Sequence, residues 1–369
     1  MSKTRLGTVP PVISVRLRAC RSRIQQERLD GYLVTDRTEQ LYLTGFDGED
    51  GAALILRGRV YLLTDGRFTE EAGRSAGWAK AVVRIGPITE VLAPLVDRHR
   101  LKRIGFNPAH LSVSAHKSYA KAVRPGRLVA LAEMAKQMRL IKDPTELDAL
   151  REAIRIAEAA FLSVVGRIRI GMTERELAAD LQHEMLRCGA DVAAFPIIVA
   201  EGPNSSRPHA MPGNRRIRKG SAILIDWGAV CRHYRSDLTR VVFVHKIPPR
   251  FRRMYEAVLA AQAEGIRAVR PGARMCDVYE RARASLEAAG MARQFTHGLG
   301  HGIGLEVHEP PSLSKPMTDP LMAGMVVTVE PGVYFPGIGG VRIEDDVLVT
   351  ETGARVMSRL PKDLDSMVV

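Results

Sequence analysis

Apolar side chains recur at helical spacing in four segments of the second part of the chain. The clearest segment begins with Asp-Pro-Thr-Glu at 143–146, where a capping Asp precedes a Pro at the first helical position and a Glu follows three residues after the cap. The apolar positions that follow are three or four residues apart, at Leu147, Leu150, Ile154, Ala157 and Phe161. We expect a second helix from Thr173 to Gly189, and two more that end near Gly272 and Gly290.

Short apolar runs in this part predict strands, because they are bounded by turn residues. The expected strands are 197–200, 222–228, 236–244, 325–329 and 341–349. Twice, over 141–250 and 250–350, two helices precede a strand pair that carries two acidic residues. This echo indicates two related half-sites, although the identity between the halves is too low to define a repeat.

The first part of the chain alternates helix-like and strand-like segments, as α/β domains do. Helices are expected at 16–28 and 88–98, and strands at 31–35, 52–56, 59–64 and 103–107. A boundary falls near Lys142. We therefore predict an α/β (α+β) protein with an N-terminal α/β domain at 10–135 and a second domain at 143–355.

Four carboxylates lie on or at the ends of the expected strands in the second part. Asp226 and Glu330 each end an apolar run, and Asp237 and Glu344 lie on the partner strands. Buried carboxylates that are gathered together repel one another unless they are protonated or bind a cation. The pattern predicts a shared acidic site.

A glycine-rich segment supplies imidazoles. Three of the ten histidines, His297, His301 and His308, lie within twelve residues, and glycines at 298, 300, 302 and 304 argue against a helix there. Carboxylates with one imidazole suit Mn, Co, Fe or Zn. Two such ions about 3.5–4 Å apart support hydrolysis.

Five motifs together resemble one known family. They are Asp-Trp-Gly-Ala at 226–229, Ser-Asp-Leu-Thr-Arg at 236–240, His-Gly-Leu-Gly-His-Gly at 297–302, Val-Glu-Pro-Gly at 329–332 and Gly-Val-Arg-Ile-Glu-Asp at 340–345. The chain resembles the pita-bread metallopeptidases, in the branch of Xaa-Pro aminopeptidase and prolidase. Its first part is similar to the creatinase-type N-terminal domain of that branch. The resemblance implies a creatinase-type domain followed by a pita-bread catalytic domain.

The resemblance also implies roles for individual residues. The metal ligands would be Asp226, Asp237, His301, Glu330 and Glu344, with Asp237 and Glu344 shared by both ions. Glu330 would also move a proton during catalysis, and His308 would bind the scissile carbonyl. The substrate-side residues would be His209, His297, His308 and Arg342. Thr239, two residues from Asp237 on one strand, would face the same side and support the ligands.

The function that follows from the resemblance is hydrolysis of Xaa-Pro bonds at the N-terminus of dipeptides or short peptides. Two divalent ions per chain are expected, with Mn favoured and Co, Zn or Fe also suitable. A short peptide is the expected substrate, and a homodimer is the expected assembly. The preference for proline rests on the resemblance alone.

Three alternatives remain open. A methionine aminopeptidase would carry the same five ligands, but the large N-terminal domain and the His-Glu-Pro sequence at 308–310 argue against it. A creatinase-like hydrolase shares the two-domain fold without metal, and a non-catalytic pita-bread binding protein typically lacks ligands. This chain retains all five.

Charge and cysteine usage indicate which partners and which cellular compartment to expect. The formal net charge is +13, and most of the excess lies in the first 140 residues, yet no nucleic-acid motif accompanies it. We expect no specific nucleic-acid partner. Four cysteines without CxxC spacing suit a reducing compartment. The polar start at 1–15 and the short apolar runs predict neither a signal peptide nor a membrane partner, so a cytoplasmic location is expected.

Overall fold

The structure, a computed structural model, describes residues 7–132 and 134–369. The chain forms two compact units, Met1–Met138 and Arg139–Val369, and each is described by itself. The first six residues of the polar start lie outside the described residues. Within the described part of the chain, no helix combines the length and apolarity needed to cross a bilayer.

A six-stranded mixed sheet forms the centre of the first unit, in the order β4-β3-β2-β1-β5-β6. Its strands are β1 (Gly31–Val34), β2 (Ala52–Leu56), β3 (Val60–Asp65), β4 (Lys80–Arg84), β5 (Arg103–Phe106) and β6 (Arg127–Ala130). The helices are α1 (Pro11–Gln26), α2 (Arg37–Thr44), α3 (Thr69–Ala76), α4 (Ile88–His99), α5 (Val113–Ala122) and α6 (Met134–Arg139). Strands β1 to β3 pair antiparallel, whereas β4, β5 and β6 join in parallel.

The expected elements of this unit appear, and further ones join them. Helix α4 continues through Pro94, and α1 begins five residues before the expected start, at Pro11. Helix α2 was not expected from the pattern. Its local signals are nevertheless present, because the Asp36 side chain caps its start and Gly45 ends it with a φ of 76°.

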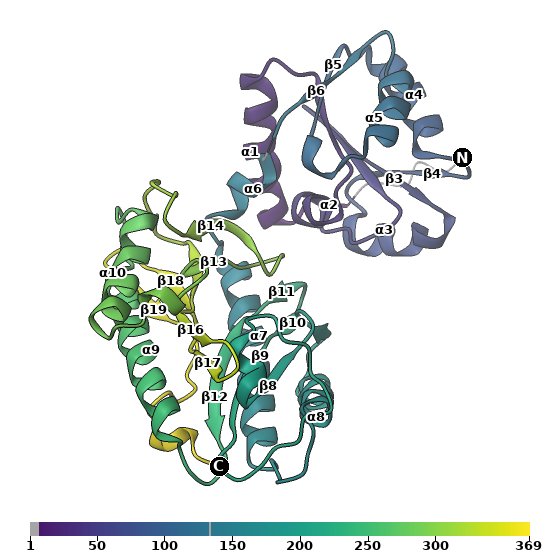
Figure 1. The fold of residues 1–369 in the computed structure, drawn as a ribbon. Helices are drawn as coiled ribbons and strands as arrows, with labels where there is room; N and C mark the ends of the chain where they lie inside the picture. Colours follow the sequence, from purple (N-terminus) through teal and green to yellow (C-terminus); the bar gives the residue numbers. More distant parts are fainter. Residues whose placement is uncertain (1–6, 133) are drawn as a thin grey trace. The chain divides into compact units, whose positions relative to one another are not determined.

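The second unit pairs two sets of helices with several small sheets. Its helices are α7 (Pro144–Val165), α8 (Glu174–Arg187), α9 (Pro249–Ala268) and α10 (Met275–Ala288). Helices α7 and α8 both begin with a capping box, at Asp143 and Thr173, as the sequence indicates. In Figure 1, α9 and α10 lie on one side of this unit and α8 on the other, with strands between them.

Four sheets of the second unit contain the strands near which the four acidic residues of the predicted site lie. The first two are β12-β9-β8 and β11-β10-β7, built from β7 (Val192–Ala193), β8 (Ile198–Glu201), β9 (Ala222–Trp227), β10 (Ala229–Cys231), β11 (Tyr234–Arg235) and β12 (Leu238–Phe243). The others are β14-β13-β15-β18-β19 and β16-β17, built from β13 (Gly300–Gly302), β14 (Glu309–Leu313), β15 (Val326–Val329), β16 (Gly332–Phe335), β17 (Gly339–Arg342), β18 (Asp345–Val349) and β19 (Ala354–Val356). Together with the first unit, these strands and helices confirm the mixed α/β class.

One expected strand is wrong. The segment 341–349 is two strands in different sheets, β17 and β18, because the chain leaves the β16–β17 hairpin after Arg342. Glu344 lies at the break and forms an isolated bridge to Thr239 of β12. The β16–β17 hairpin was missed since its prolines and glycines indicate a loop. Gly340 permits close packing there, because a Cβ would lie 2.4 Å from the Ser205 carbonyl oxygen.

The core of the second unit holds β9 in place. All six residues of β9 are buried. The Trp227 ring stacks on Phe161 of α7, with centroids 4.5 Å apart and planes 9° apart. Its indole Nε1 donates to the Ala157 carbonyl oxygen at 3.0 Å. The strand that carries Asp226 is therefore fixed against α7.

Candidate metal centre

The four acidic residues at strand ends converge in the second unit. Asp226 lies in β9, opposite Thr239 of β12 in the antiparallel register. Asp237 immediately precedes β12, Glu330 immediately follows β15, and Glu344 lies between β17 and β18. All four line one cavity of about 720 Å³, together with His209, His297, His301, His308 and Arg342. The structure thus brings together every residue that the sequence proposes for the site.

Burial and mutual repulsion make this cluster a strong acceptor for positive charge. Burial first, and then the charges of neighbouring carboxylates, raise the pKa of Asp237 and Glu344 well above the ordinary range. Burial also raises the pKa of Asp226 and brings the pKa of Glu330 to about 8. The carboxylates therefore hold protons unless a cation compensates them.

Arg342 provides part of that compensation. Its Nη2 donates to Asp226 Oδ2 at 2.5 Å and its Nη1 to the Tyr334 hydroxyl at 2.7 Å. Its Nε donates to Thr239 Oγ1 at 3.1 Å, and that hydroxyl donates to Glu344 Oε2 at 2.7 Å. Thr239 therefore supports a candidate ligand. One guanidinium leaves most of the acidic charge unbalanced.

His301 faces the same carboxylates. Its Nε2 lies 3.7 Å from Asp237 Oδ2 and 3.4 Å from Glu330 Oε1. Its Nδ1 lies 3.1 Å from the Gly302 carbonyl oxygen, which can only accept, so the ring proton belongs on Nδ1. Burial, and secondarily His308, lowers the pKa of His301 to about 4. A neutral imidazole thus presents its Nε2 lone pair to the cluster, which is the form that binds metal.

The cluster fits a divalent cation. Ligand-type atoms of Asp237, His301 and Glu344 lie within 4.8 Å of one another. Asp226 Oδ1 and Glu344 Oε1 are buried without a hydrogen-bond partner. Buried polar atoms normally have a partner, so these two oxygens indicate ligands for an ion. Oxygen ligands with one imidazole suit Mn²⁺, Fe²⁺, Co²⁺ or Zn²⁺.

Besides His301, three more histidines line the cavity, and their surroundings differ. His297 contacts the Gly298 carbonyl oxygen through Nδ1 at 2.7 Å and the Tyr334 hydroxyl through Nε2 at 2.9 Å. Burial lowers the pKa of His297 to about 4. His308 is exposed to the cavity and packs edge-on against His301, with ring centroids 4.2 Å apart. His209 is exposed on the same cavity.

Some residues of the cavity were missed by the sequence reasoning. Tyr334 contacts both His297 and Arg342, and its position four residues after Glu330 carries no recognisable signal. An apolar wall was also missed, because its members come from separate segments; they are Phe195, Pro196, Ile198, Met211 and Val307.

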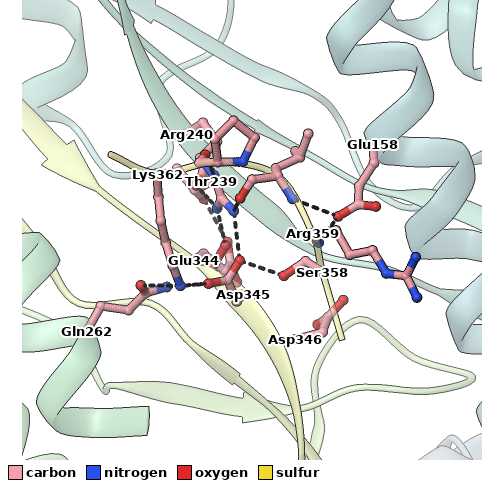
Figure 2. A network of polar contacts seen from close by, with 12 residues as sticks. Glu158, Thr239, Arg240, Gln262, Glu344, Asp345, Asp346, Ser358, Arg359 and Lys362 are labelled. Atoms are coloured by element: carbon pink, nitrogen blue, oxygen red, sulfur yellow. Dashed lines mark hydrogen bonds and ion pairs between the residues drawn. The ribbon is translucent and has the colours of Figure 1, made fainter. Parts of the chain in front are cut away.

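A second buried ionic network surrounds Asp345, the residue that follows Glu344 in the chain (Figure 2). Asp345 Oδ1 accepts from Arg240 Nη2 at 2.8 Å and from Ser358 Oγ at 2.5 Å. Asp345 Oδ2 accepts from Gln262 Nε2 at 3.0 Å and also pairs with Lys362. These partners outweigh burial and lower the pKa of Asp345. We call Arg240, Asp345, Ser358 and Lys362 the back network.

Known proteins resemble the chain over nearly its whole length. An uncharacterized peptidase of Bacillus subtilis is 36% identical over 95% of this chain and 99% of its own. The solved structure of a Xaa-Pro dipeptidase from Bacillus anthracis is 34% identical, with a TM-score of 0.93 over 97% of this chain and 100% of that one. An X-Pro aminopeptidase from Thermotoga maritima is also 34% identical, with a TM-score of 0.88 over 94% of this chain and 100% of that one.

Two family models divide the chain between them. The Creatinase/Prolidase N-terminal domain matches residues 16–141, and Metallopeptidase family M24 matches residues 148–351. The expected architecture, a creatinase-type domain before a pita-bread catalytic domain, is confirmed, and so is the resemblance to the prolidase branch. The chain belongs to metallopeptidase family M24 and is a metallopeptidase.

Proposed function

We propose that this metallopeptidase uses two divalent ions to hydrolyse Xaa-Pro bonds at the N-terminus of dipeptides or short peptides. The observation that carries the proposal is the buried cluster of four carboxylates with two unpartnered oxygens at the floor of an open cavity. The names of the two solved relatives, a Xaa-Pro dipeptidase and an X-Pro aminopeptidase, support the substrate class.

The ions would be held by five side chains. Asp226, Asp237, His301, Glu330 and Glu344 are the proposed ligands, with Asp237 and Glu344 shared between the two sites. When bound, such ions supply Lewis acidity and bring the pKa of a water molecule close to neutrality. We favour Mn²⁺, and Co²⁺, Zn²⁺ or Fe²⁺ also suit these ligands.

Glu330 is the proposed proton carrier. Its side chain is 17% exposed and borders the cavity, so it can reach both the cluster and a bound peptide. It takes a proton from the attacking water and returns it to the departing proline nitrogen.

The histidines are proposed to bind the peptide. His308, exposed beside His301, donates to the scissile carbonyl oxygen as it gains charge, where a donor is most effective. His209 and His297 contact the substrate from the other parts of the cavity lining, and Arg342 orients Asp226 and the substrate-side Tyr334. The apolar wall provides a surface for the proline ring, whose amide has no N–H to satisfy.

A competition assay tests the substrate class. Ala-Pro, Ala-Pro-Ala and Ala-Ala are supplied together with the enzyme loaded with Mn²⁺ or Co²⁺, and a Met-Ala peptide is added to test the methionine aminopeptidase alternative. The two proline peptides should be cleaved much faster than Ala-Ala and Met-Ala. Equal rates on Ala-Ala would refute the proline preference, and the ratio of the first two rates separates a dipeptidase from an aminopeptidase.

Metal number and assembly need separate measurements. Elemental analysis after loading and desalting should give about two ions per chain. Sedimentation should give a dimer, the assembly that we propose from the resemblance. A protein that is active with no bound metal would overturn the dinuclear proposal.

A further inference from the structure

His308 and Glu309 are adjacent residues with different surroundings. Glu309 begins β14, and His308 immediately precedes it. His308 is exposed on the cavity, whereas the Glu309 side chain is 2% exposed. His308 lies in the bend that leads into β14 and shares a peptide bond with Glu309. A contact that fixes the Glu309 side chain therefore also restrains the backbone that carries His308.

Two cations hold the Glu309 carboxylate. Lys142 Nζ donates to Glu309 Oε1 at 2.8 Å, and Arg139 Nη2 donates to Glu309 Oε2. Both cationic side chains are at least 97% buried. Burial alone would raise the pKa of Glu309, but these two charges outweigh it and hold the pKa below its usual range. Glu309 is thus a fully ionised anchor inside the protein.

The same contacts restrain the loop that ends at His308. Arg139 Nη2 also donates to Glu306 Oε2 at 2.8 Å, and the Glu306 amide lies 3.4 Å from Glu309 Oε2. On the other side of this loop, Arg235 donates through its backbone amide to the Gly304 carbonyl oxygen at 2.9 Å and through its side chain to the Leu305 carbonyl oxygen. The segment 304–309 is therefore held at both ends.

Stability alone does not account for this arrangement. Buried ion pairs contribute little net stability compared with well-packed apolar side chains, because both charges lose their hydration. What the pair does provide is a fixed geometry. Of the described residues, His308 lines the cavity while Glu309, Arg139 and Lys142 do not. These three charged side chains can therefore influence a bound substrate through the backbone that joins Glu309 to His308.

We propose that Glu309, held by Arg139 and Lys142, is a positioning residue that directs His308 at the scissile carbonyl. The inference rests on the proposed role of His308 and adds the device that maintains its direction. A misplacement of about 1 Å at a reacting group can lower the rate roughly 100-fold. Loss of the Glu309 anchor should therefore lower kcat by about 10- to 100-fold.

The experiment is a double-mutant cycle between Glu309→Gln and His308→Ala in the metal-loaded, full-length enzyme. Glu309→Gln should lower kcat with little change in KM, because the carbonyl contact strengthens in the transition state. Bound metal should stay at the wild-type level. In the double variant, kcat should equal that of His308→Ala alone, because both changes remove one interaction.

A charge-balanced variant separates positioning from folding. Glu309→Gln leaves two buried cations with one fewer partner, so this variant should lose stability. Glu309→Gln with Lys142→Met removes one charge of each sign and leaves Arg139 paired with Glu306. This variant should melt close to the wild type and still show the low kcat. Glu306→Gln is the matched control, since Glu306 shares Arg139 but is 31% exposed; its kcat should fall by no more than about threefold.

The outcomes distinguish the role of His308 from the positioning role of Glu309. Full activity of His308→Ala would overturn the proposed role of His308 and the positioning proposal with it. A low kcat for His308→Ala combined with a multiplicative further loss in the double variant would overturn the positioning proposal alone. Wild-type kcat in Glu309→Gln, or loss of the metals from it, would also overturn that proposal.

Discussion

Glu344 and Asp345 are neighbours in the chain, yet their carboxylates lie in opposite electrostatic surroundings (Figure 2). Burial and the charges of Glu330 and Asp226 raise the pKa of Glu344 well above its usual range. Asp345 is equally buried, but Arg240 and Lys362 lower its pKa. The two side chains belong to the candidate metal centre and to the back network, respectively.

The comparison shows that burial does not identify a functional acid; the balance of charge around it does. Asp345 has a guanidinium, an ammonium, a hydroxyl and an amide as donors. Glu344 has one hydroxyl donor and one oxygen without a partner. The carboxylate of Asp345 is therefore fully compensated by the protein, whereas that of Glu344, a proposed ligand, is not.

The back network also restrains the backbone of the candidate metal centre. Arg240 is completely buried, and its Nη1 donates to the Glu344 carbonyl oxygen at 2.6 Å. Its remaining donors reach the Leu360 and Pro361 carbonyl oxygens at 3.1 Å. The C-terminal segment 358–362 is thereby tied to the backbone of a candidate ligand.

The largest effect should come from the shared ligands. Asp237→Asn or Glu344→Gln should abolish measurable activity and lower the bound metal, because each removes a charge that offsets two cations. The fold should survive, and the metal-free variant should be about as stable as metal-free wild type, because the amide replaces a carboxyl group whose raised pKa keeps it protonated when no cation is bound. Elemental analysis, kcat and thermal melting check this, and full activity in either variant would refute the assignment.

Asp345→Asn should have the opposite effect on the metal-free protein. It leaves Arg240 and Lys362 without their carboxylate, and breaking a buried pair typically costs about 3–5 kcal/mol. Urea unfolding of the metal-free protein should show this loss. Equal stability of Asp345→Asn and Glu344→Gln would remove the contrast between the two acids.

The metal-free protein should lose stability as pH rises. The folded-state pKa of Glu330 is about 8, above its value in the unfolded chain, so its contribution to stability is full below about pH 4.5 and is lost as pH rises through about 8. Metal binding at pH 7 must displace protons, roughly one or more per chain. Calorimetry in two buffers of different ionisation enthalpy measures this release, and a heat that does not depend on the buffer would contradict it.

The smallest effect should come from Asp346, whose surroundings are intermediate between those of Glu344 and those of Asp345. It is buried, with its pKa raised well above the usual range, and its Oδ2 lies 3.3 Å from the Asp237 amide that donates to it. A protonated Asp is replaced by Asn at little electrostatic cost, so Asp346→Asn should change melting and metal content only slightly. Asp65→Asn is the control: Asp65 is half-buried in the first unit, where it pairs with the exposed Arg67, and this variant should retain its metal.

Much of this site could be anticipated because its residues end apolar runs. Asp226 and Glu330 stand where a buried strand stops, and a charge there needs a reason. The strand boundaries after Glu330 could not be anticipated. The β16–β17 hairpin depends on glycines that pack against Phe251 and Ser205 from distant segments, and such close approach leaves no local pattern.

The back network was equally invisible in the sequence. Asp345 and Lys362 are seventeen residues apart, and Arg240 lies more than a hundred residues before both of them. Nothing near Arg240 in the chain indicates that its partners are carbonyl oxygens of the C-terminal segment. Side chains whose partners are distant in the sequence produce no periodic pattern along the chain.

Trp227, stacked on Phe161 beside Asp226, has a spectroscopic consequence. The chain has two tryptophans, Trp78 in the first unit and Trp227 in the second. In a Trp78→Phe variant all indole emission would come from a fully buried ring one residue from a candidate ligand. Its intensity should then change when the ions load, so fluorescence would follow metal uptake in real time. The reciprocal Trp227→Phe variant would report the unfolding of the first unit alone.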